Sequence, residues 1–372
     1  MREHFLLDPE FAFLNHGSFG ACPIPVFEAF QAWQAKLEQQ PVAFFQRALG
    51  EHMNTARSVA AEYLNADTDH LHFVRNATVG VNIIARSVNL QPGDEVLTTN
   101  HEYGAVDAIW EFVCEQAGAH YVKRSIPLPY TSDVDFIEQL WQGVSERTRV
   151  IALSHITSPT ALTLPVERVC KRAREEGITT AVDGAHAPGQ LPLNLTTINA
   201  DYYTGNFHKW LCAPKSAGFL YTQPEHTETL YPLVLSWGWA RGEVGTTRHE
   251  WKGTDNPAAY LSVPDAIKWQ VEQKWDAVRE ACHTLAVDYR ARLVELCGTR
   301  PTSPDDNFRQ MFTVELPPCD AANVQETLWR DYKVEVPVTI WNGRQFLRVS
   351  VQGYNTAADL DRLLHAVGDV FR

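Results

Sequence analysis

The sequence has little that favours secretion, metal binding or membrane insertion. No stretch of 18 apolar residues occurs, so no membrane-spanning helix is expected. The first residues include acids and no long apolar run, which argues against a signal peptide. The seven cysteines are odd in number, scattered and without a Cys-x-x-Cys pair, which disfavours a disulfide framework and a structural zinc site. We therefore expect a cytoplasmic protein without a metal.

Positive charge is also scarce. There are 32 Lys and Arg against 45 Asp and Glu, giving a net charge of −13, and no basic run interrupts the balance. This argues against nucleic acid or an anionic membrane as a partner. A local cationic pocket for a small anion stays possible. The 372 residues, 45% hydrophobic and 21% charged, are typical of a globular protein of about two domains.

Short apolar strands alternate with helical segments between about residues 65 and 225. Alternation of this kind indicates parallel βαβ units, and hence an α/β fold with a mostly parallel sheet flanked by helices. The strands are expected at 71–74, 94–98, 150–154, 178–182, 202–203 and 218–221, and the helices at 26–37, 76–88, 104–117 and 165–176.

The last third of the chain follows a different pattern. Residues 258–298 show helical periodicity, and strands are expected at 311–316, 334–338 and 346–351 before a closing helix from Thr356. This grouping predicts a smaller α+β domain. We expect an N-terminal arm over 1–20, a large domain over 21–255 and a small domain over 256–372, with the boundary in a Gly/Thr/Pro-rich stretch.

Three of the expected strands run into loops with unusual polar groups. In sheets of this class, active sites lie in the loops after the carboxyl ends of the strands. A lysine there can bond to an aldehyde, a buried carboxylate can hold a pyridine nitrogen protonated, and a helix start can bind a phosphate. The three loops are Asp183-Gly184-Ala185-His186, Asn206-Phe207-His208-Lys209 and Arg75-Asn76-Ala77-Thr78.

Each loop also has an ordinary interpretation. Asp183 could make a turn, Lys209 could be exposed, and Thr78 could simply begin a helix. Their occurrence together, on successive βα units, favours a pyridoxal 5'-phosphate site.

With these loops the chain resembles the class V aminotransferase family of fold-type I pyridoxal-phosphate enzymes over almost its whole length. Other carrying motifs are Gly253-Thr254, Leu347-Arg348-Val349-Ser350 and Tyr354-Asn355-Thr356. The segments Leu14-Asn15-His16-Gly17-Ser18-Phe19-Gly20 and His101-Glu102-Tyr103 resemble the isopenicillin N epimerase-like branch in particular.

The resemblance implies a role for each matching residue. Lys209 is implied to hold the cofactor and to move the substrate α-proton, while Asp183 pairs with the pyridine nitrogen. His186 contacts the 3-oxygen of the cofactor, and Tyr103 stacks on its ring. The phosphate-contacting positions are Ala77, Thr78, Asn206 and His208.

Further implied roles concern the substrate and the assembly. Arg348 is implied to bind the carboxylate of a small amino-acid substrate, a task suited to its two-pronged donor group. The branch-specific segment places Asn15 and His16 beside the substrate. Thr254 matches a threonine that reaches the phosphate of a partner subunit, which implies a homodimer with shared active sites.

The chain also departs from the family pattern. Ser158 stands where desulfurases carry an asparagine that contacts the cofactor. Residues 334–348 contain no cysteine where desulfurases place their nucleophile, and Cys319 lies too early in the chain, so thiolate-based desulfuration is disfavoured. Two remaining features are the pair His70 and His72, interpreted as structural, and Trp237 with Trp239, which could line a substrate pocket.

The resulting hypothesis is an enzyme that acts at the α-carbon of an amino acid, with isopenicillin N epimerase-like activity. The alternatives are a C–S lyase or an aminotransferase of the same family, or a non-catalytic binding or regulatory protein of this fold. The sequence leaves the substrate, the fate of the α-proton and any acid on the second face of the substrate open.

Overall fold

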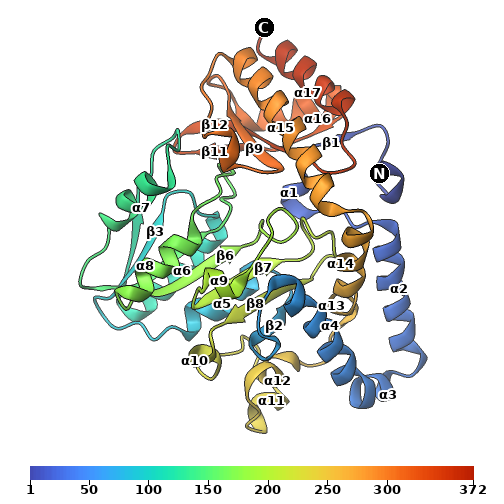
Figure 1. Ribbon diagram of the computed structural model, residues 1–372, viewed down its shortest axis with the longest axis vertical. Helices are drawn as coiled ribbons and strands as arrows, with labels where there is room; N and C mark the ends of the chain where they lie inside the picture. The colour runs from blue at the N-terminus through green and yellow to red at the C-terminus, as the bar shows by residue number, and fades with distance from the viewer.

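A seven-stranded sheet of order β2-β8-β7-β6-β5-β3-β4 forms the centre of the computed structural model, which describes residues 1–372 (Figure 1). Strand β8 is antiparallel to both of its neighbours, and the other pairs are parallel. The strands are β2 (Leu71–Val74), β3 (Glu95–Thr99), β4 (His120–Arg124), β5 (Thr148–Ser154), β6 (Thr179–Gly184), β7 (Tyr202–Asn206) and β8 (Gly218–Thr222).

Helices cover the sheet, and this explains why most of its strands read as continuous apolar runs. The helices that follow strands are α5 (Ala77–Ser87), α6 (Gly104–Ala117), α7 (Asp133–Trp141), α8 (Val166–Glu175) and α9 (Leu195–Ile198). A second layer, at the right of Figure 1, consists of α2 (Ile24–Gln39), α3 (Pro41–Ala43), the π-helical turn Phe44–Ala48, α4 (Leu49–Leu64), α13 (Ala258–Leu261) and α14 (Val263–Glu272).

A smaller unit lies at the C-terminal end, at the top of Figure 1, with an apolar core of its own. Its antiparallel sheet has the order β11-β12-β9. Its elements are α15 (Trp275–Cys297), β9 (Met311–Glu315), α16 (Ala321–Tyr332), β11 (Val338–Trp341), β12 (Arg344–Ser350) and α17 (Ala357–Val370). The α/β prediction with a mostly parallel sheet and a smaller α+β part is therefore confirmed.

The expected strand over 334–338 is divided in two. The two-residue strand β10 (Val334–Glu335) pairs in parallel with β1 (Ala12–Phe13) of the N-terminal arm, whereas β11 pairs with β12. The break falls at Pro337, which has no N–H to continue a ladder. These two strands form a separate two-stranded sheet, and Ala12 and Leu14 of the arm pack in the core of the small unit. Helix α1 (His16–Phe19) follows directly.

The large apolar core extends further along the chain than the strands of the large sheet do. Tyr260, Trp269 and Trp275 pack in the core of the large sheet, and the core of the small unit takes up the chain at Cys282. A domain boundary near residue 255 stays a prediction.

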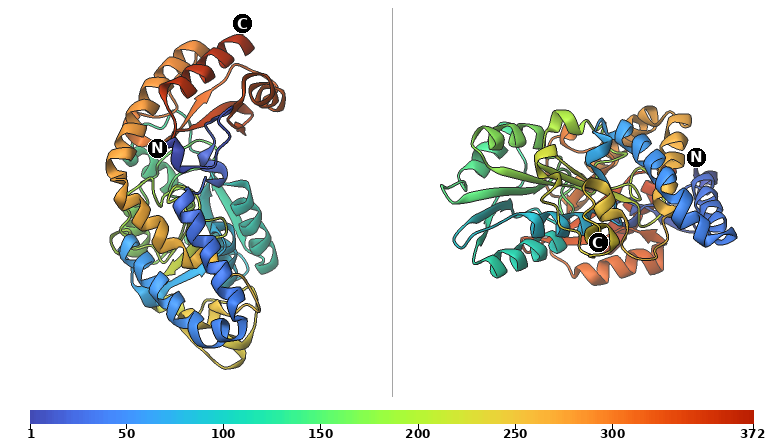
Figure 2. Two further views of the ribbon diagram at one scale, coloured as in Figure 1. Left: turned by 90° about the vertical axis from the view of Figure 1, so that its right-hand side faces the viewer. Right: turned by 90° about the horizontal axis from the view of Figure 1, so that it is seen from below.

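The segment between β8 and α13 protrudes at the bottom of Figure 1 and at one end of the elongated molecule in Figure 2. It contains α10 (Pro224–Thr227), α11 (Trp237–Ala240) and α12 (Gly245–Glu250). The short 3-10 turns elsewhere are Arg2–His4, Thr68–His70 and Asp305–Asn307. None of the helices combines the length and apolar composition that crossing a bilayer requires.

Candidate active site

The three polar loops meet at one edge of the large sheet. Because β2 is antiparallel to β8, and β8 to β7, the carboxyl ends of β2, β7 and β6 lie at the same edge. Between them is a cavity of about 180 Å³, called the inner cavity here. The predicted residues that line it are Ala77, Thr78, Tyr103, Ser158, Asp183, His186, Asn206, His208 and Lys209.

A second, outer cavity of about 540 Å³ adjoins the first. The residues common to both cavities are Ser18, Phe19, Tyr103, Ser158 and Lys209. Arg348 lines only the outer cavity, together with the β11–β12 hairpin residues 339–342. Lys209 therefore lies at the junction, where a group held in the inner cavity and a ligand held by Arg348 can meet.

The amine of Lys209 loses its proton more easily than an ordinary lysine amine. Burial, reinforced by the charge of Arg348, lowers its pKa to about 7. Its Nζ lies 3.3 Å from Nε2 of His186, whose Nδ1 accepts a hydrogen bond from Trp210 Nε1 at 3.3 Å. Nε2 of His186 therefore carries the ring hydrogen, and burial keeps the pKa of this histidine well below its ordinary value. A neutral lysine amine is the form that can bond to an aldehyde.

Asp183 is a buried carboxyl with no cationic side chain within ion-pair distance. One of its oxygens, Oδ1, accepts the backbone N–H of Ala185 at 2.9 Å. Burial raises its pKa, while the charge of Lys209 opposes the shift. A protonated pyridine nitrogen is the kind of partner that such a carboxyl lacks.

Donors for an anion gather at the start of α5. The Asn76 side chain caps the helix by accepting the Val79 N–H at 2.9 Å, and Asn206 Oδ1 accepts the Ala77 N–H at 2.8 Å. This leaves the amide nitrogen of Asn206 and the Thr78 hydroxyl as donors beside a helix N-terminus, which attracts phosphate.

His208 stands at the same end of the inner cavity. Its Nδ1 lies 3.0 Å from the carbonyl of Ala217, which leaves Nε2 free. Burial lowers its pKa to about 4. A neighbouring anion favours the charged imidazole, so a phosphate raises this pKa.

Arg348 is held by three hydrogen bonds. Its two terminal nitrogens donate to Ser158 Oγ at 2.9 Å and to Ser18 Oγ at 2.9 Å, and one of them also donates to the carbonyl of Ser158 at 2.8 Å. Its Nε is buried without a partner. Burial lowers its pKa to about 10, so the group stays charged. A carboxylate in the outer cavity is the partner that this arrangement fits.

Three residues expected near the site do not line either cavity. Asn15 accepts the Ser18 hydroxyl at 2.6 Å and donates to Glu335 at 2.9 Å, so it braces Arg348 indirectly. His16 lies 3.0 Å from the Lys209 carbonyl on one side and 3.0 Å from the hydroxyl of Tyr354 on the other. Any effect of these two residues on a substrate is therefore indirect.

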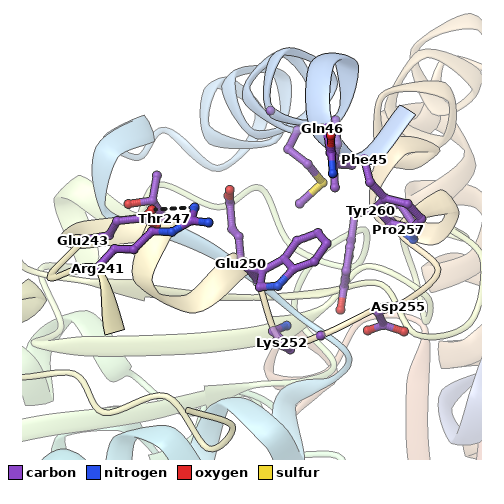
Figure 3. Close-up of a pocket in the computed structure, with 15 residues that line it drawn as sticks. Phe45, Gln46, Arg241, Glu243, Thr247, Glu250, Lys252, Asp255, Pro257 and Tyr260 are labelled. Atoms are coloured by element: carbon purple, nitrogen blue, oxygen red, sulfur yellow. Dashed lines mark ion pairs between the residues drawn. The ribbon is translucent and has the colours of Figure 1, made fainter. Parts of the chain in front are cut away.

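The third residue is Thr254, which lies beside β2 and away from the inner cavity. It lines surface hollows together with Trp237 and with Arg75. A separate cavity next to it is walled by Phe45, Glu250, Lys252, Asp255 and Tyr260, among others (Figure 3). That cavity contains neither Lys209 nor Asp183, so it is not the candidate site. His72 also lies apart, packed against His249.

Sequence reasoning gave no role to Ser18, Phe19, Ser154 and the β11–β12 hairpin. The hairpin is anchored by Trp341, whose ring stacks on His101 with centroids 4.5 Å apart and whose Nε1 donates to the Asn100 carbonyl at 2.7 Å. The absence of a cysteine is the only sequence signal in this stretch, and it excludes a function without indicating one. Glu102 belongs to the His101-Glu102-Tyr103 motif, which assigns it no role.

A neutral lysine, an unpaired buried carboxyl and a helix N-terminus around one cavity fit pyridoxal 5'-phosphate, and with the fold they define a fold-type I enzyme that uses this cofactor. The chain belongs to the family described as Aminotransferase class-V, whose model matches residues 24–363. It is 35% identical to isopenicillin N epimerase of Amycolatopsis lactamdurans, over 99% of this chain and 97% of that protein.

Other relatives have different activities. A probable chloroplastic L-cysteine desulfhydrase of Arabidopsis thaliana is 28% identical, over 98% of this chain and 84% of that protein. The solved structure of the cysteine desulfurase CsdA of Escherichia coli matches with a TM-score of 0.82 and 25% identity, covering 100% of this chain and 97% of the other. The protein is therefore a class V pyridoxal-phosphate enzyme, and its relatives include epimerases and lyases.

Proposed function

We propose that this enzyme inverts the configuration at the α-carbon of an amino-acid substrate, as an epimerase. The observation that carries the proposal is the position of Lys209, whose neutral amine lies between the inner cavity and the carboxylate-binding Arg348. When bound, the cofactor supplies an aldehyde for the substrate amine and a ring that withdraws electrons from the α-carbon.

The residues of the chain then divide the work. Arg348 binds the substrate carboxylate and fixes the α-carbon near Lys209. Lys209 removes the α-proton, and Asp183 keeps the pyridine nitrogen protonated. Return of a proton to the opposite face completes the inversion. Tyr103 lines both cavities, which supports a ring stacked on the cofactor.

The cysteine content supports chemistry at the α-carbon over thiolate-based desulfuration. The hairpin above the outer cavity, residues 338–350, has no cysteine. Cys212 lies near Lys209 in the sequence but is fully buried, and burial raises the pKa of its thiol far above the ordinary value. No thiolate is therefore available to attack a sulfur of the substrate.

The second candidate is a C–S lyase that eliminates a substituent from the β-carbon. The similarity to the Arabidopsis thaliana desulfhydrase favours it. Elimination starts with the same removal of the α-proton and needs no thiolate. Transamination differs only in where the proton returns, so the first steps do not separate these outcomes.

The test is incubation of the holoenzyme with a panel of L-amino acids, including cysteine, in deuterated water. α-Deuterium in a product of inverted configuration supports the epimerase. Sulfide with pyruvate identifies a lyase, and a 2-oxo acid identifies an aminotransferase; either result as the main product overturns the proposal. Lys209→Ala is the control, because every route needs its amine.

We also propose a homodimer in which Thr254 reaches the cofactor phosphate of the partner subunit. Thr254 lies outside the inner cavity of its own chain. The adjacent segment presents unusually exposed apolar side chains, with Trp237 61% exposed, and such a patch favours an interface. Its other exposed members are Tyr231, Leu233, Val234, Leu235, Trp239 and Val244.

Dilution tests the shared site. Cofactor occupancy should fall together with the dimer fraction, because the cofactor stabilises the assembled form by mass action. Thr254→Ala should weaken cofactor retention without moving the absorbance maximum, while Thr247→Ala, on the nearby surface of α12, should not. A monomer with full occupancy in gel filtration contradicts the proposal.

The proposed setting is the cytoplasm. All seven cysteines are free in the structure, as a reducing compartment requires. Fractionation of cells that express the tagged protein tests this location.

A further inference from the structure

A second carboxyl is buried beside the cofactor site, and nothing above uses it. Glu102, in the loop between β3 and α6, is 6% exposed and contributes to the wall of the outer cavity. Its Oε1 accepts the Thr99 hydroxyl at 2.7 Å, and its Oε2 accepts the Ser154 hydroxyl at 2.6 Å. No Lys, Arg or His lies within ion-pair distance, so Glu102 is a buried acid without a countercharge.

Ser154 connects this acid to Asp183. It ends β5 and is the register partner of Asp183 in the neighbouring parallel strand β6. Register partners project to the same face of a sheet, and both residues line the inner cavity. The Ser154 hydroxyl is therefore bonded to Glu102 and lies on the same face of the sheet as Asp183 of the neighbouring strand.

We propose that Glu102 is a positioning residue that acts through Ser154 to strengthen the hold of Asp183 on the ring nitrogen of the cofactor. The inference rests on the role proposed for Asp183. It requires no particular outcome at the α-carbon.

The direction in which the Ser154 hydroxyl donates its hydrogen bond determines how basic Asp183 is. While Glu102 is ionised, Ser154 donates to it, and Asp183 keeps its full basicity for the ring nitrogen. When Glu102 gains a proton, it donates to Ser154, which must turn its own hydrogen into the inner cavity, toward Asp183. Thr99 is less suited to this turn, because one of the two lone pairs of its oxygen already accepts the His101 N–H at 3.2 Å. Protonation of Glu102 therefore weakens the basicity of Asp183.

Several charged groups set the pH at which this change occurs. Burial raises the pKa of Glu102 to about 7, the hydroxyls of Ser154 and Thr99 oppose the shift, and the charges of Asp183 and Asp107 add to it. Asp107 faces Glu102 from α6, and it accepts the hydroxyl of Tyr121 of β4 at 2.8 Å and lies 3.1 Å from the Lys123 amine. Lys209 and Arg348 share the outer cavity with Glu102. A stronger hold on the ring nitrogen is thus expected above neutral pH.

The test uses apoprotein loaded with 4-deoxypyridoxine 5'-phosphate, which has the ring nitrogen and the phosphate but no aldehyde. The ultraviolet spectrum of this bound probe reports protonation of its ring nitrogen as the pH is varied. Glu102→Gln should lower the apparent pKa of the ring nitrogen by about one unit, the scale on which a nearby charge acts. Glu115→Gln, at the exposed surface of helix α6, is the matched control and should leave it unchanged.

Two further variants separate the proposed route from a purely structural role. Ser154→Ala removes the hydroxyl that turns toward Asp183, so by itself it should leave the pKa of the ring nitrogen close to that of the wild type with ionised Glu102. The double variant should behave like Ser154→Ala, because Glu102→Gln has no route to Asp183 without this hydroxyl. Glu102→Asp should restore part of the effect.

Infrared spectra of the apoprotein give an independent readout. In the wild type, the carbonyl band of protonated Glu102 should be present at acid pH and disappear as the pH rises through about 7. The same titrating band should be seen in Asp183→Asn, and it should be absent from Glu102→Gln. An unshifted ring nitrogen in Glu102→Gln, or full additivity with Ser154→Ala, overturns the proposal. If Glu102→Gln does not fold, the Ser154→Ala spectra decide: the weaker hold on the ring nitrogen at acid pH should be lost in this variant, and its persistence overturns the proposal. None of these measurements involves turnover, so they can fail while the epimerase proposal stands.

Discussion

Replacing Arg348 by glutamine should slow the attachment of the cofactor to Lys209, and the effect should depend on pH. The charge of Arg348 is the second cause, after burial, of the lowered pKa of Lys209. Removing that charge makes the protonated amine easier to form. Since only the neutral amine can attack the aldehyde, the rate of attachment follows its fraction.

The magnitude follows from the position of the pKa. Lys209 has a pKa of about 7, so half of the amine is neutral at pH 7. Loss of a nearby charge shifts a pKa by about one unit or more. With a pKa near 8 the neutral fraction falls to about one tenth, which slows attachment about fivefold at pH 7. At pH 9 both forms are largely neutral, and the two rates should nearly coincide.

Stopped-flow mixing of apoprotein with the cofactor, followed by absorbance between pH 6 and pH 9, measures this rate. The midpoint of the profile should move up in Arg348→Gln. Arg344→Gln is the matched control, because Arg344 is on the same strand but pairs with Glu315 outside the site. An equal slowing at every pH would indicate damaged geometry and refute the electrostatic reasoning, and an unchanged profile would refute it as well.

Three further predictions concern single residues. Asp183→Asn should keep the cofactor bound but slow exchange of the substrate α-proton for deuterium by about a thousandfold, because a neutral amide cannot hold the ring nitrogen protonated; near wild-type exchange measured by NMR argues against its role. Arg348→Lys should weaken substrate binding by about 2–3 kcal/mol and so raise KM roughly 30- to 150-fold, since a single point charge replaces a planar two-pronged donor. An unchanged KM in steady-state assays would show that Arg348 does not bind the substrate carboxylate. The pKa of Glu102 is raised from 4.5 to about 7, so its stabilising contribution is present at acid pH and lost as the pH rises through 7; relative to Glu102→Gln, the wild type should lose about 3 kcal/mol of unfolding free energy between pH 4.5 and 8 in urea titrations, and parallel curves would contradict this.

The parts of the fold and site that the sequence predicted are those with a local signal. Asp183 lies near the end of β6 and Lys209 follows β7, and in both strands a continuous apolar run marks a strand buried on both faces. Strand β4 was missed because it lies at the sheet edge, where its five residues are partly exposed and carry polar side chains.

Contacts between distant segments had no such signal. The bond from Arg348 to Ser18 joins residues 330 positions apart, and that between Glu102 and Ser154 joins residues 52 apart. No periodicity records such a pairing, so the braces around the site could be read only from the folded chain. A resemblance placed Asn15 and His16 near the substrate, and neither residue lines the inner or the outer cavity.

The N-terminal arm also affects when the site can be completed during synthesis. Its His16 contacts Lys209 across 193 positions and Tyr354 across 338, and its strand β1 pairs with β10. At about 5 to 20 residues per second, a ribosome needs roughly 16 to 64 s to make the 320 or so residues that separate the arm from its last partners. The arm is made before its partners and is therefore fixed late, as expected for contacts of such long range. A nascent chain that already contains Lys209 and the large sheet still lacks Arg348, Tyr354 and β10, and hence the partners that hold the arm behind the lysine loop.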